Sequence, residues 1–236
     1  MSHHYIRFSD VSYEYPGGVK ALDGVSFYVG HGEKVALLGR NGAGKSTLLL
    51  HTDGLLMASS GEVNVGDVPV TKKTLPVIRQ SVGIVFQNPD DQLFMPTVEE
   101  DVAFGPLNMG LPPEEVERRV AGALEAVGVP HLRKRAPWQL SGGQKRSVAI
   151  ATTLSMEPSV LVLDEPTSNL DWDARRRVIE ILKSFHHTCI IATHDLDLVN
   201  EMCPRSIVME KGHVAADGPT AELLADRRVL DILGID

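Results

Sequence analysis

The sequence is short of the residues that mark secreted, membrane-spanning and nucleic-acid-binding proteins. It has two cysteines, Cys189 and Cys203, which we expect to be reduced and packed rather than joined in a disulfide or a metal site. No apolar run approaches the roughly 18 residues that span a bilayer, and Met1–Phe8 lacks the apolar run of a signal peptide. We therefore expect a cytoplasmic chain, with any membrane link made through a partner.

Basic residues are also outnumbered. The chain of 236 residues has 23 lysines and arginines against 31 aspartates and glutamates, which gives a formal net charge of −8. A nucleic-acid-binding surface needs a basic patch, so this balance gives no support to a nucleic-acid partner. The length and the 43% share of hydrophobic residues suit one large globular α/β domain.

Apolar segments alternate with helix-like segments toward both ends of the chain. Strands are predicted at residues 6–11, 25–29, 34–38, 62–65, 82–86, 160–163, 188–193 and 206–209, with a helix at 45–55. Such alternation favours a mostly parallel sheet that helices cover on both faces.

The middle of the chain has a helical pattern instead. Thr97 and Glu100 have the spacing of a capping box, and further helices are predicted from Pro113 to Gly128 and over 141–155. We therefore expect a single domain over 1–236, in which 1–87 and 159–236 form an α/β core and about 88–158 form a helical subdomain.

Residues 39–47, here called the phosphate loop, match the pattern G-x-x-x-x-G-K-[ST] between a buried strand and a helix. Glycines let backbone N–H groups curl around phosphate oxygens, and the helix N-terminus adds its positive dipole end. Lys45 can reach the β- and γ-phosphates, and the Ser46 hydroxyl can bind Mg²⁺. The expected nucleotide-binding residues of the loop are Gly39, Asn41, Gly42, Gly44, Lys45, Ser46 and Thr47.

An apolar strand at 160–163 ends in two carboxylates, Asp164 and Glu165. Asp164 is placed to hold Mg²⁺, and Glu165, one residue beyond, can polarise an attacking water. Taken alone, the pair is as consistent with a solvated acidic turn. The phosphate loop favours the catalytic interpretation.

Leu140-Ser141-Gly142-Gly143-Gln144, here called the signature segment, begins a predicted helix. A serine hydroxyl and glycine N–H groups at a helix start form a second anion site. Two phosphate-binding elements in one chain suggest two chains that face each other across the nucleotide. Gln87 and His194 each follow a predicted strand and by themselves are ordinary loop residues.

Together these motifs resemble the ABC transporter ATPase family over essentially the whole chain. Their order carries the resemblance: the phosphate loop, Gln87, the signature segment, the acidic strand end, Ser168-Asn169-Leu170-Asp171 and His194. The resemblance implies an active ATPase that uses ATP and Mg²⁺. It also implies a P-loop NTPase core with a mostly parallel sheet, an N-terminal antiparallel β subdomain and a helical insertion subdomain.

The resemblance implies roles for individual residues. Tyr15 would stack on adenine, with Tyr13 as the alternative, and Gln87 would sense Mg²⁺ and the γ-phosphate. Across a dimer interface, the signature residues Ser141, Gly142, Gly143 and Gln144 would contact the nucleotide of the opposite subunit, as would Asp171. Glu165 would be the base and His194 a switch histidine. Asn169 departs from the Ala or Gly of many relatives, a change that could alter communication between the two sites.

Residues 86–94 and 96–106 resemble energy-coupling-factor importers. This implies a groove between about 88 and 110 that receives a helix of a membrane coupling subunit, and a substrate-binding membrane subunit beside it. His51 and the short chain after His194 resemble cobalt or nickel systems, while biotin and other vitamins remain alternatives. The dimer could be a homodimer or include a second ATPase chain.

Other classes fit less well. Soluble ABC ATPases usually carry long coiled-coil insertions or two fused copies, which this sequence lacks. The segment 86–106 argues against an exporter. The sequence also lacks the Asn-Lys-x-Asp motif that would indicate a GTPase. Neither His3-His4 nor His186-His187 has the spacing of a metal site, so we expect no metal path through this chain.

Overall fold

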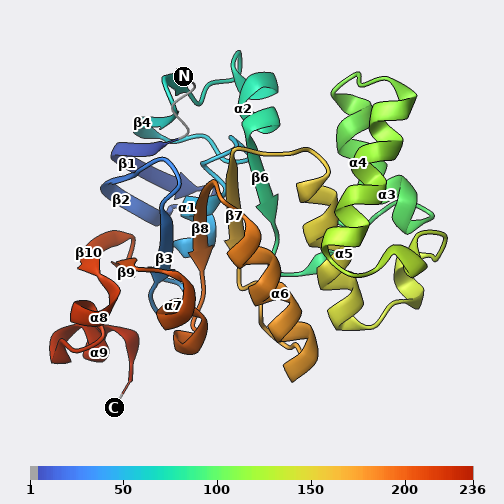
Figure 1. Cartoon of the computed structure of the whole chain (residues 1–236). Coiled ribbons are helices and arrows are strands. Elements are labelled where there is room, and N and C mark those ends of the chain that lie inside the picture. Colours follow the sequence, from blue (N-terminus) through green and yellow to red (C-terminus); the bar gives the residue numbers. More distant parts are fainter. Residues whose placement is uncertain (1–4, 236) are drawn as a thin grey trace. The chain divides into compact units, whose positions relative to one another are not determined.

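The computed structural model describes residues 5–235, so His3 and His4 lie outside the described residues (Figure 1). The chain divides into two compact units. The first contains the chain up to Val82, Ser159–Asp164 and the chain from His187 onward, and the second contains Gly83–Pro158 and Glu165–His186.

The first unit begins with an antiparallel sheet. It consists of β1 (Ile6–Tyr15), β2 (Val19–Val29), β4 (Ser60–Val65) and β5 (Val68–Pro69), in the order β2-β1-β4-β5. Ile6, Phe8 and Val11 are buried, and the ring of Phe8 stacks on Phe27 with centroids 4.6 Å apart. The predicted N-terminal antiparallel sheet is therefore confirmed.

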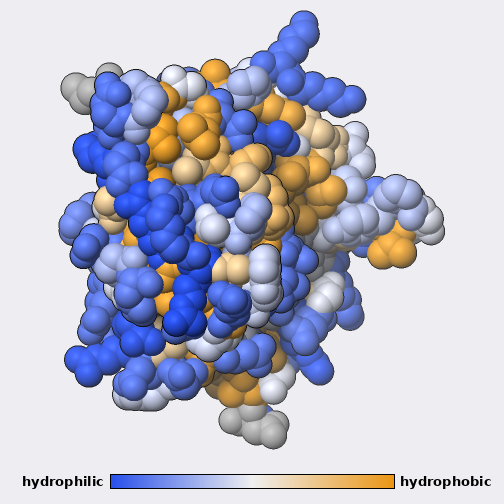
Figure 2. Space-filling model, turned by 90° about the vertical axis from the view of Figure 1, so that its right-hand side faces the viewer, coloured by the Kyte–Doolittle hydropathy of each residue, from blue (hydrophilic) through white to orange (hydrophobic). Residues whose placement is uncertain are grey.

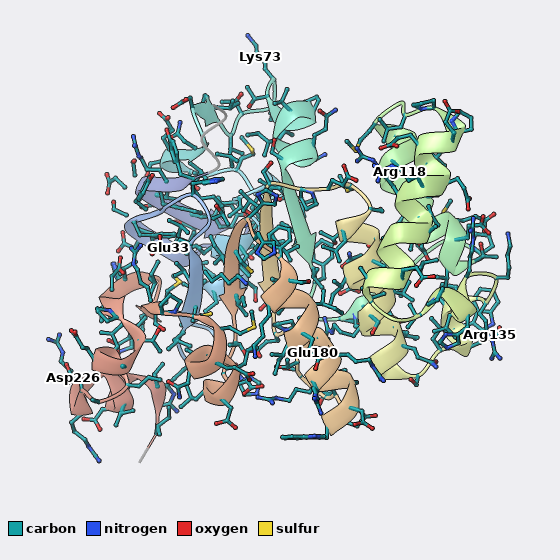
Figure 3. The ribbon with its side chains drawn as sticks, viewed as in Figure 1. Glu33, Lys73, Arg118, Arg135, Glu180 and Asp226 are labelled. Atoms are coloured by element: carbon teal, nitrogen blue, oxygen red, sulfur yellow. The ribbon has the colours of Figure 1, made fainter. Side chains whose placement is uncertain are left out.

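A second sheet forms the core of the first unit. It contains β3 (Lys34–Leu38), β7 (Val160–Asp164), β8 (Thr188–Ala192), β9 (Arg205–Glu210) and β10 (His213–Pro219), in the order β10-β9-β3-β8-β7. All pairs are parallel except β10 with β9. Arg205 ties β9 to Glu33, labelled in Figure 3, through an ion pair of 3.0 Å. The mostly parallel core is as predicted.

The helices described in the first unit are α1 (Lys45–Leu49), α2 (Leu75–Ser81), α7 (Leu196–Met202), α8 (Thr220–Leu223) and α9 (Arg227–Leu233). The prediction of a helix over 45–55 was wrong, because α1 ends at Leu49. Side chains take the carbonyls that a longer helix would use: His51 Nδ1 lies 2.7 Å from the Thr47 oxygen, and Thr52 Oγ1 donates to the Leu49 oxygen at 2.6 Å. Gly54, with φ 70°, then turns the chain.

The second unit is mainly helical. Its segments are the last three residues of β6 (Val82–Val85), η1 (Pro89–Asp91), α3 (Val98–Asn108), α4 (Pro113–Ala126), η2 (Pro130–Leu132), η3 (Pro137–Gln139), α5 (Gly142–Leu154) and α6 (Trp172–Ser184). Thr97 caps α3 by accepting from the Glu100 N–H at 3.3 Å, and Gly128 follows α4 with φ 72°. Both predicted helix ends are confirmed.

Ion pairs hold α4 in the second unit. Arg118, labelled in Figure 3, bonds Glu115 at 2.6 Å and Glu157 at 2.9 Å, and Arg119 bonds Glu157 at 3.0 Å. Arg119 also donates to the Met156 carbonyl at 3.1 Å. These contacts fasten α4 to the segment that follows α5.

Both cysteines are free and buried, as predicted. Burial raises the pKa of Cys203 to about 12, and it raises the pKa of Cys189 as well, so both thiols stay protonated at neutral pH. Within residues 5–235, no helix has the length and apolar character needed to cross a membrane.

Candidate active site

The phosphate loop connects β3 to α1 in the first unit. Two of its glycines have no room for a side chain: a Cβ on Gly39 would lie 2.5 Å from the Met209 oxygen, and one on Gly44 would lie 2.6 Å from the Ala21 oxygen. Both also have positive φ, at 148° and 103°. This backbone shape is the one that lets consecutive N–H groups face an anion.

The Lys45 side chain folds back over this loop. It is 8% exposed, and its ammonium donates to the carbonyls of Gly39 at 2.7 Å and Arg40 at 3.3 Å. A cation held at this position can stabilise the charge of phosphate oxygens that bind the loop.

Tyr15 lies beside the end of the phosphate loop. Its hydroxyl is 3.1 Å from Thr47 Oγ1, and its ring meets that of Tyr13 edge to face with centroids 5.0 Å apart. Tyr15 is 37% exposed, whereas Tyr13 is only partly exposed. Both rings are therefore accessible in part, and the choice of Tyr15 over Tyr13 as the base-stacking platform stays a prediction.

Three parallel strands bring further site residues to one edge of the core sheet. Ala192 of β8 pairs with Leu37 of β3 on one side and with Asp164 of β7 on the other. His194 lies two residues beyond Ala192, and the phosphate loop starts at Gly39, two residues beyond Leu37. Both therefore follow their strands at the edge where β7 ends at Asp164. Ligands of open α/β sheets bind outside this carboxyl edge.

The donor set at this edge suits Mg²⁺. Helix α1, which carries Ser46, packs against β7, which ends at Asp164. A hydroxyl and a carboxylate are hard oxygen ligands, and Mg²⁺ usually keeps waters and phosphate oxygens besides one or two such protein ligands. Residues 5–235 contain no group of three or more His, Cys, Asp or Glu side chains that could hold a metal ion.

In the second unit, the signature segment starts α5 with a reciprocal cap. Ser141 Oγ accepts from the Gln144 N–H at 3.3 Å, and Gln144 Oε1 accepts from the Ser141 N–H at 3.0 Å. Ser141 and Gly142 are exposed, and Gly143 and Gln144 are partly exposed. The helix start thus presents an ordered, accessible set of small residues.

The turn after Asp164 also belongs to the second unit. Glu165 is 6% exposed and has a left-handed backbone, with φ 49°, which is unusual for a residue with a side chain. Ser168 Oγ donates to Glu165 Oε2 at 3.1 Å, and this bond fixes the carboxylate. Asp171 caps α6 by accepting from the Ala174 N–H at 2.8 Å.

Gln87 is exposed, and its backbone is held by two residues that the sequence patterns did not reveal. Arg146 of α5, 3% exposed, donates to the carbonyls of Phe86 at 2.6 Å and Gln87 at 2.5 Å. Gln92 accepts from the Phe86 N–H at 3.2 Å and donates to the Ala149 carbonyl at 2.8 Å. No sequence pattern around Arg146 or Gln92 indicates this support, because it depends on the packing of α5 against the segment around Gln87.

Each unit therefore brings together a part of the predicted site. The first unit gathers Tyr15, the phosphate loop, Asp164 and His194. The second unit holds Gln87, the signature segment, Glu165 and Asp171. Within the second unit, the signature segment lies close to the start of α6, since a Cβ on Gly143 would be 2.9 Å from the Ala174 methyl.

Comparisons with known proteins identify relatives of similar sequence and fold. The energy-coupling factor transporter ATP-binding protein EcfA of Methanothermobacter thermautotrophicus is 48% identical over 230 residues, which cover 95% of this chain and 74% of the relative. The structure of cbiO1 from Clostridium perfringens, part of the ABC transporter complex cbiONQ, superposes with a TM-score of 0.84 at 40% identity, over 98% of this chain and 94% of that one.

A dimeric post-hydrolysis structure of the ATP-binding cassette MJ0796, bound to ADP and Pi, superposes with a TM-score of 0.82 at 26% identity. The match covers 91% of this chain and 98% of that one. The family model described as ABC transporter matches residues 22–168, which include the phosphate loop, the signature segment and the acidic strand end. The chain belongs to the ABC transporter family and is an ATPase of that family.

Proposed function

We propose that the chain is the ATP-hydrolysing subunit of an energy-coupling-factor importer and that it works as a dimer. The carboxyl edge of β3, β7 and β8 supports this proposal most directly, because it aligns the phosphate loop with Asp164 and His194. The relationship to EcfA and cbiO1 supports the importer class. An ATPase of the same fold without a transport partner is the alternative.

In this proposal, the chain's own groups divide the hydrolysis between them. Tyr15 stacks on adenine, and backbone N–H groups of the phosphate loop bind the phosphates together with Lys45. Glu165 accepts a proton from the attacking water as its oxygen bonds to the γ-phosphorus, and the bond to the β-phosphate oxygen breaks. His194 donates a hydrogen bond to a γ-phosphate oxygen and orients the water.

Mg²⁺ fits beside these groups. Ser46 and Asp164 would hold it, with Gln87 as a sensor, and when bound it neutralises charge on the β- and γ-phosphate oxygens. The Ser168 hydrogen bond keeps the Glu165 carboxylate in one orientation for its proton-accepting role.

The second chain of the dimer completes each site in this scheme. The exposed start of α5 would place Ser141 and Gly143 against the γ-phosphate bound by the opposite chain, with Asp171 across the interface. The dimeric MJ0796 structure with ADP and Pi supports this arrangement for a relative. Hydrolysis would remove the bridging phosphate and let the dimer open. The partner is a second copy or a different ATPase chain.

Glu165→Gln tests the ATPase assignment. Loss of the base should lower the hydrolysis rate about 100- to 10,000-fold while ATP still binds. Because bound ATP then persists, light scattering should show a dimer with ATP and mostly monomer without nucleotide. Near-normal turnover would show that another group is the base, and absence of hydrolysis in the unmodified chain would refute the function.

A helix of an integral membrane coupling subunit is the proposed partner of the surface at residues 88–110. Phe94, Phe104 and Leu107 are 63%, 43% and 58% exposed, and the two phenylalanine rings meet with centroids 5.0 Å apart. Figure 2, viewed from the side that carries α3 and α4, shows hydrophobic residues among hydrophilic ones. Exposed apolar groups gathered in this way mark an interaction surface.

Phe104→Ser should prevent co-purification with the coupling subunit and leave the ATPase rate of the isolated chain unchanged. Val77→Ser is the matched control, because Val77 is 54% exposed but lies on α2 in the other unit. Equal retention of the membrane subunits by both variants would place the docking surface elsewhere. In the cell, these partners would hold the chain at the cytoplasmic face of the membrane, beside a substrate-binding membrane subunit.

Cobalt or nickel is the proposed cargo. His51, which follows Leu48-Leu49-Leu50 in a pattern that resembles cobalt or nickel systems, favours this class over biotin or another vitamin. Uptake of cobalt or nickel should disappear in cells that carry Lys45→Ala. Intact ATPase activity without metal uptake would move the proposal to a vitamin importer.

A further inference from the structure

His51 is a buried polar residue that the proposed mechanism does not use. It is 1% exposed and lies two residues beyond the end of α1. Its Nδ1 is 2.7 Å from the Thr47 carbonyl oxygen, so Nδ1 carries the proton and donates. Its Nε2 is buried and has no hydrogen-bond partner within residues 5–235. Burial lowers the pKa of the imidazole, which keeps this ring neutral.

An orphaned buried nitrogen normally disfavours folding, and an apolar side chain at this position would avoid that cost. The contacts of His51 indicate what the imidazole supplies instead. Its ring meets the ring of Tyr13 edge to face, with centroids 4.9 Å apart and planes at 76°. The same side chain therefore contacts the carbonyl of Thr47 and the ring of Tyr13.

These two contacts connect His51 to both of the residues that contact Tyr15. Tyr13 meets the Tyr15 ring at 5.0 Å, and the Thr47 hydroxyl is 3.1 Å from the Tyr15 hydroxyl. The orientation of the exposed Tyr15 ring thus depends on two neighbours, and His51 contacts both. The backbone N–H of His51 donates to the Leu48 carbonyl. The Thr47 carbonyl therefore accepts its hydrogen bond from the His51 imidazole and not from the His51 backbone.

We propose that His51 is a positioning residue for the base-stacking platform, which it couples to the end of the phosphate loop through Thr47 and Tyr13. The inference rests on the proposed adenine-stacking role of Tyr15. His51 acts on the base end of the nucleotide and leaves the phosphate chemistry unchanged.

His51→Leu removes the donor and keeps the bulk of the side chain. Its KM for ATP should rise about five- to tenfold, the change expected when one buried hydrogen bond that supports binding is lost. Its kcat should stay within about twofold, because the groups that act in the transition state are untouched. Inhibition by inorganic tripolyphosphate, which has no base, should equal that of the unmodified chain.

His51→Gln supplies an amide donor for the Thr47 carbonyl and should bring the KM back toward the unmodified value. Thr52→Val is the matched control for lost stability, because Thr52 is equally buried and donates to the Leu49 carbonyl at 2.6 Å. It should lower the melting temperature and leave the KM unchanged.

The outcomes separate the two levels of the proposal. If the unmodified chain hydrolyses ATP but His51→Leu has an unchanged KM for ATP, the positioning role is refuted. It is also refuted if His51→Leu raises the inhibition constant of tripolyphosphate by the same factor as the KM for ATP. If Tyr15→Ala leaves the KM for ATP unchanged, the platform itself is wrong. If the unmodified chain does not hydrolyse ATP, the proposed function fails.

Discussion

Gly143→Ala adds one methyl group to the signature segment at a position with no room for it. An ideal Cβ on Gly143 would lie 2.9 Å from the Ala174 methyl and 4.0 Å from a Leu170 methyl. Carbon atoms attract each other best at about 3.5–4.0 Å, so the start of α5 or of α6 must shift by several tenths of an ångström. Overpacking of this kind costs about 1–3 kcal/mol.

Gly142→Ala is the matched control. A Cβ on Gly142 would meet no described atom within 4 Å, and alanine is a better helix former than glycine, so its stability should be equal or higher. In urea unfolding, only Gly143→Ala should lower the midpoint. The same shift would move residue 143 away from its proposed γ-phosphate contact. If this weakens transition-state stabilisation by about 1.4 kcal/mol, the ATPase rate of Gly143→Ala falls about tenfold.

Equal losses of stability in both variants would contradict overpacking at Gly143, since the two sites differ in their neighbours. A Gly143→Ala variant that is destabilised yet keeps its full rate at saturating ATP would contradict the proposed γ-phosphate contact. In that case, the close packing of α5 on α6 would be structural only.

Two further predictions concern the second unit. Hydrogen bonds from Arg133 and then Lys134 lower the pKa of Glu99 to about 2 from its usual 4.5, so this stabilisation is present above pH 4.5 and disappears as the pH falls toward 2. Between pH 4.5 and pH 2, the free energy of unfolding of the unmodified chain should therefore fall by about 1 kcal/mol more than that of Glu99→Gln, after allowance for solvent screening. Urea titrations at several pH values measure this difference, and parallel stability–pH curves for the two chains would contradict the assignment. Arg146→Lys should cost about 1–2 kcal/mol and slow ATP hydrolysis, because one charged donor replaces two. Its control Lys145→Arg keeps an ion pair with Asp90 and should change neither quantity.

Local patterns predicted the phosphate loop and the strands because their causes lie within a few residues. The glycines of the loop and the apolar run before it form one continuous stretch of sequence. The ends of α3 and α4 were also predictable, since Thr97 and Gly128 act on adjacent backbone groups. The same holds for the capping pair of Ser141 and Gln144.

Features that depend on individual side-chain bonds or on pairing with another segment were not predicted. The end of α1 at Leu49 results from side-chain bonds of His51 and Thr52 that no periodicity displays. Strand β10 has a polar, mixed sequence and forms because it pairs with β9. Arg146 looked like an ordinary helix residue, and its role appears only when the segment around Gln87 folds against α5.

The central claim is that each hydrolytic site combines the phosphate loop of one chain with the signature segment of another. The most direct test mixes two inactive variants, Lys45→Ala and Ser141→Arg, in the presence of ATP and Mg²⁺. A mixed dimer contains one intact site, so random pairing should restore about a quarter of the unmodified ATPase rate. A rate no higher than that of the separate variants would contradict the shared site.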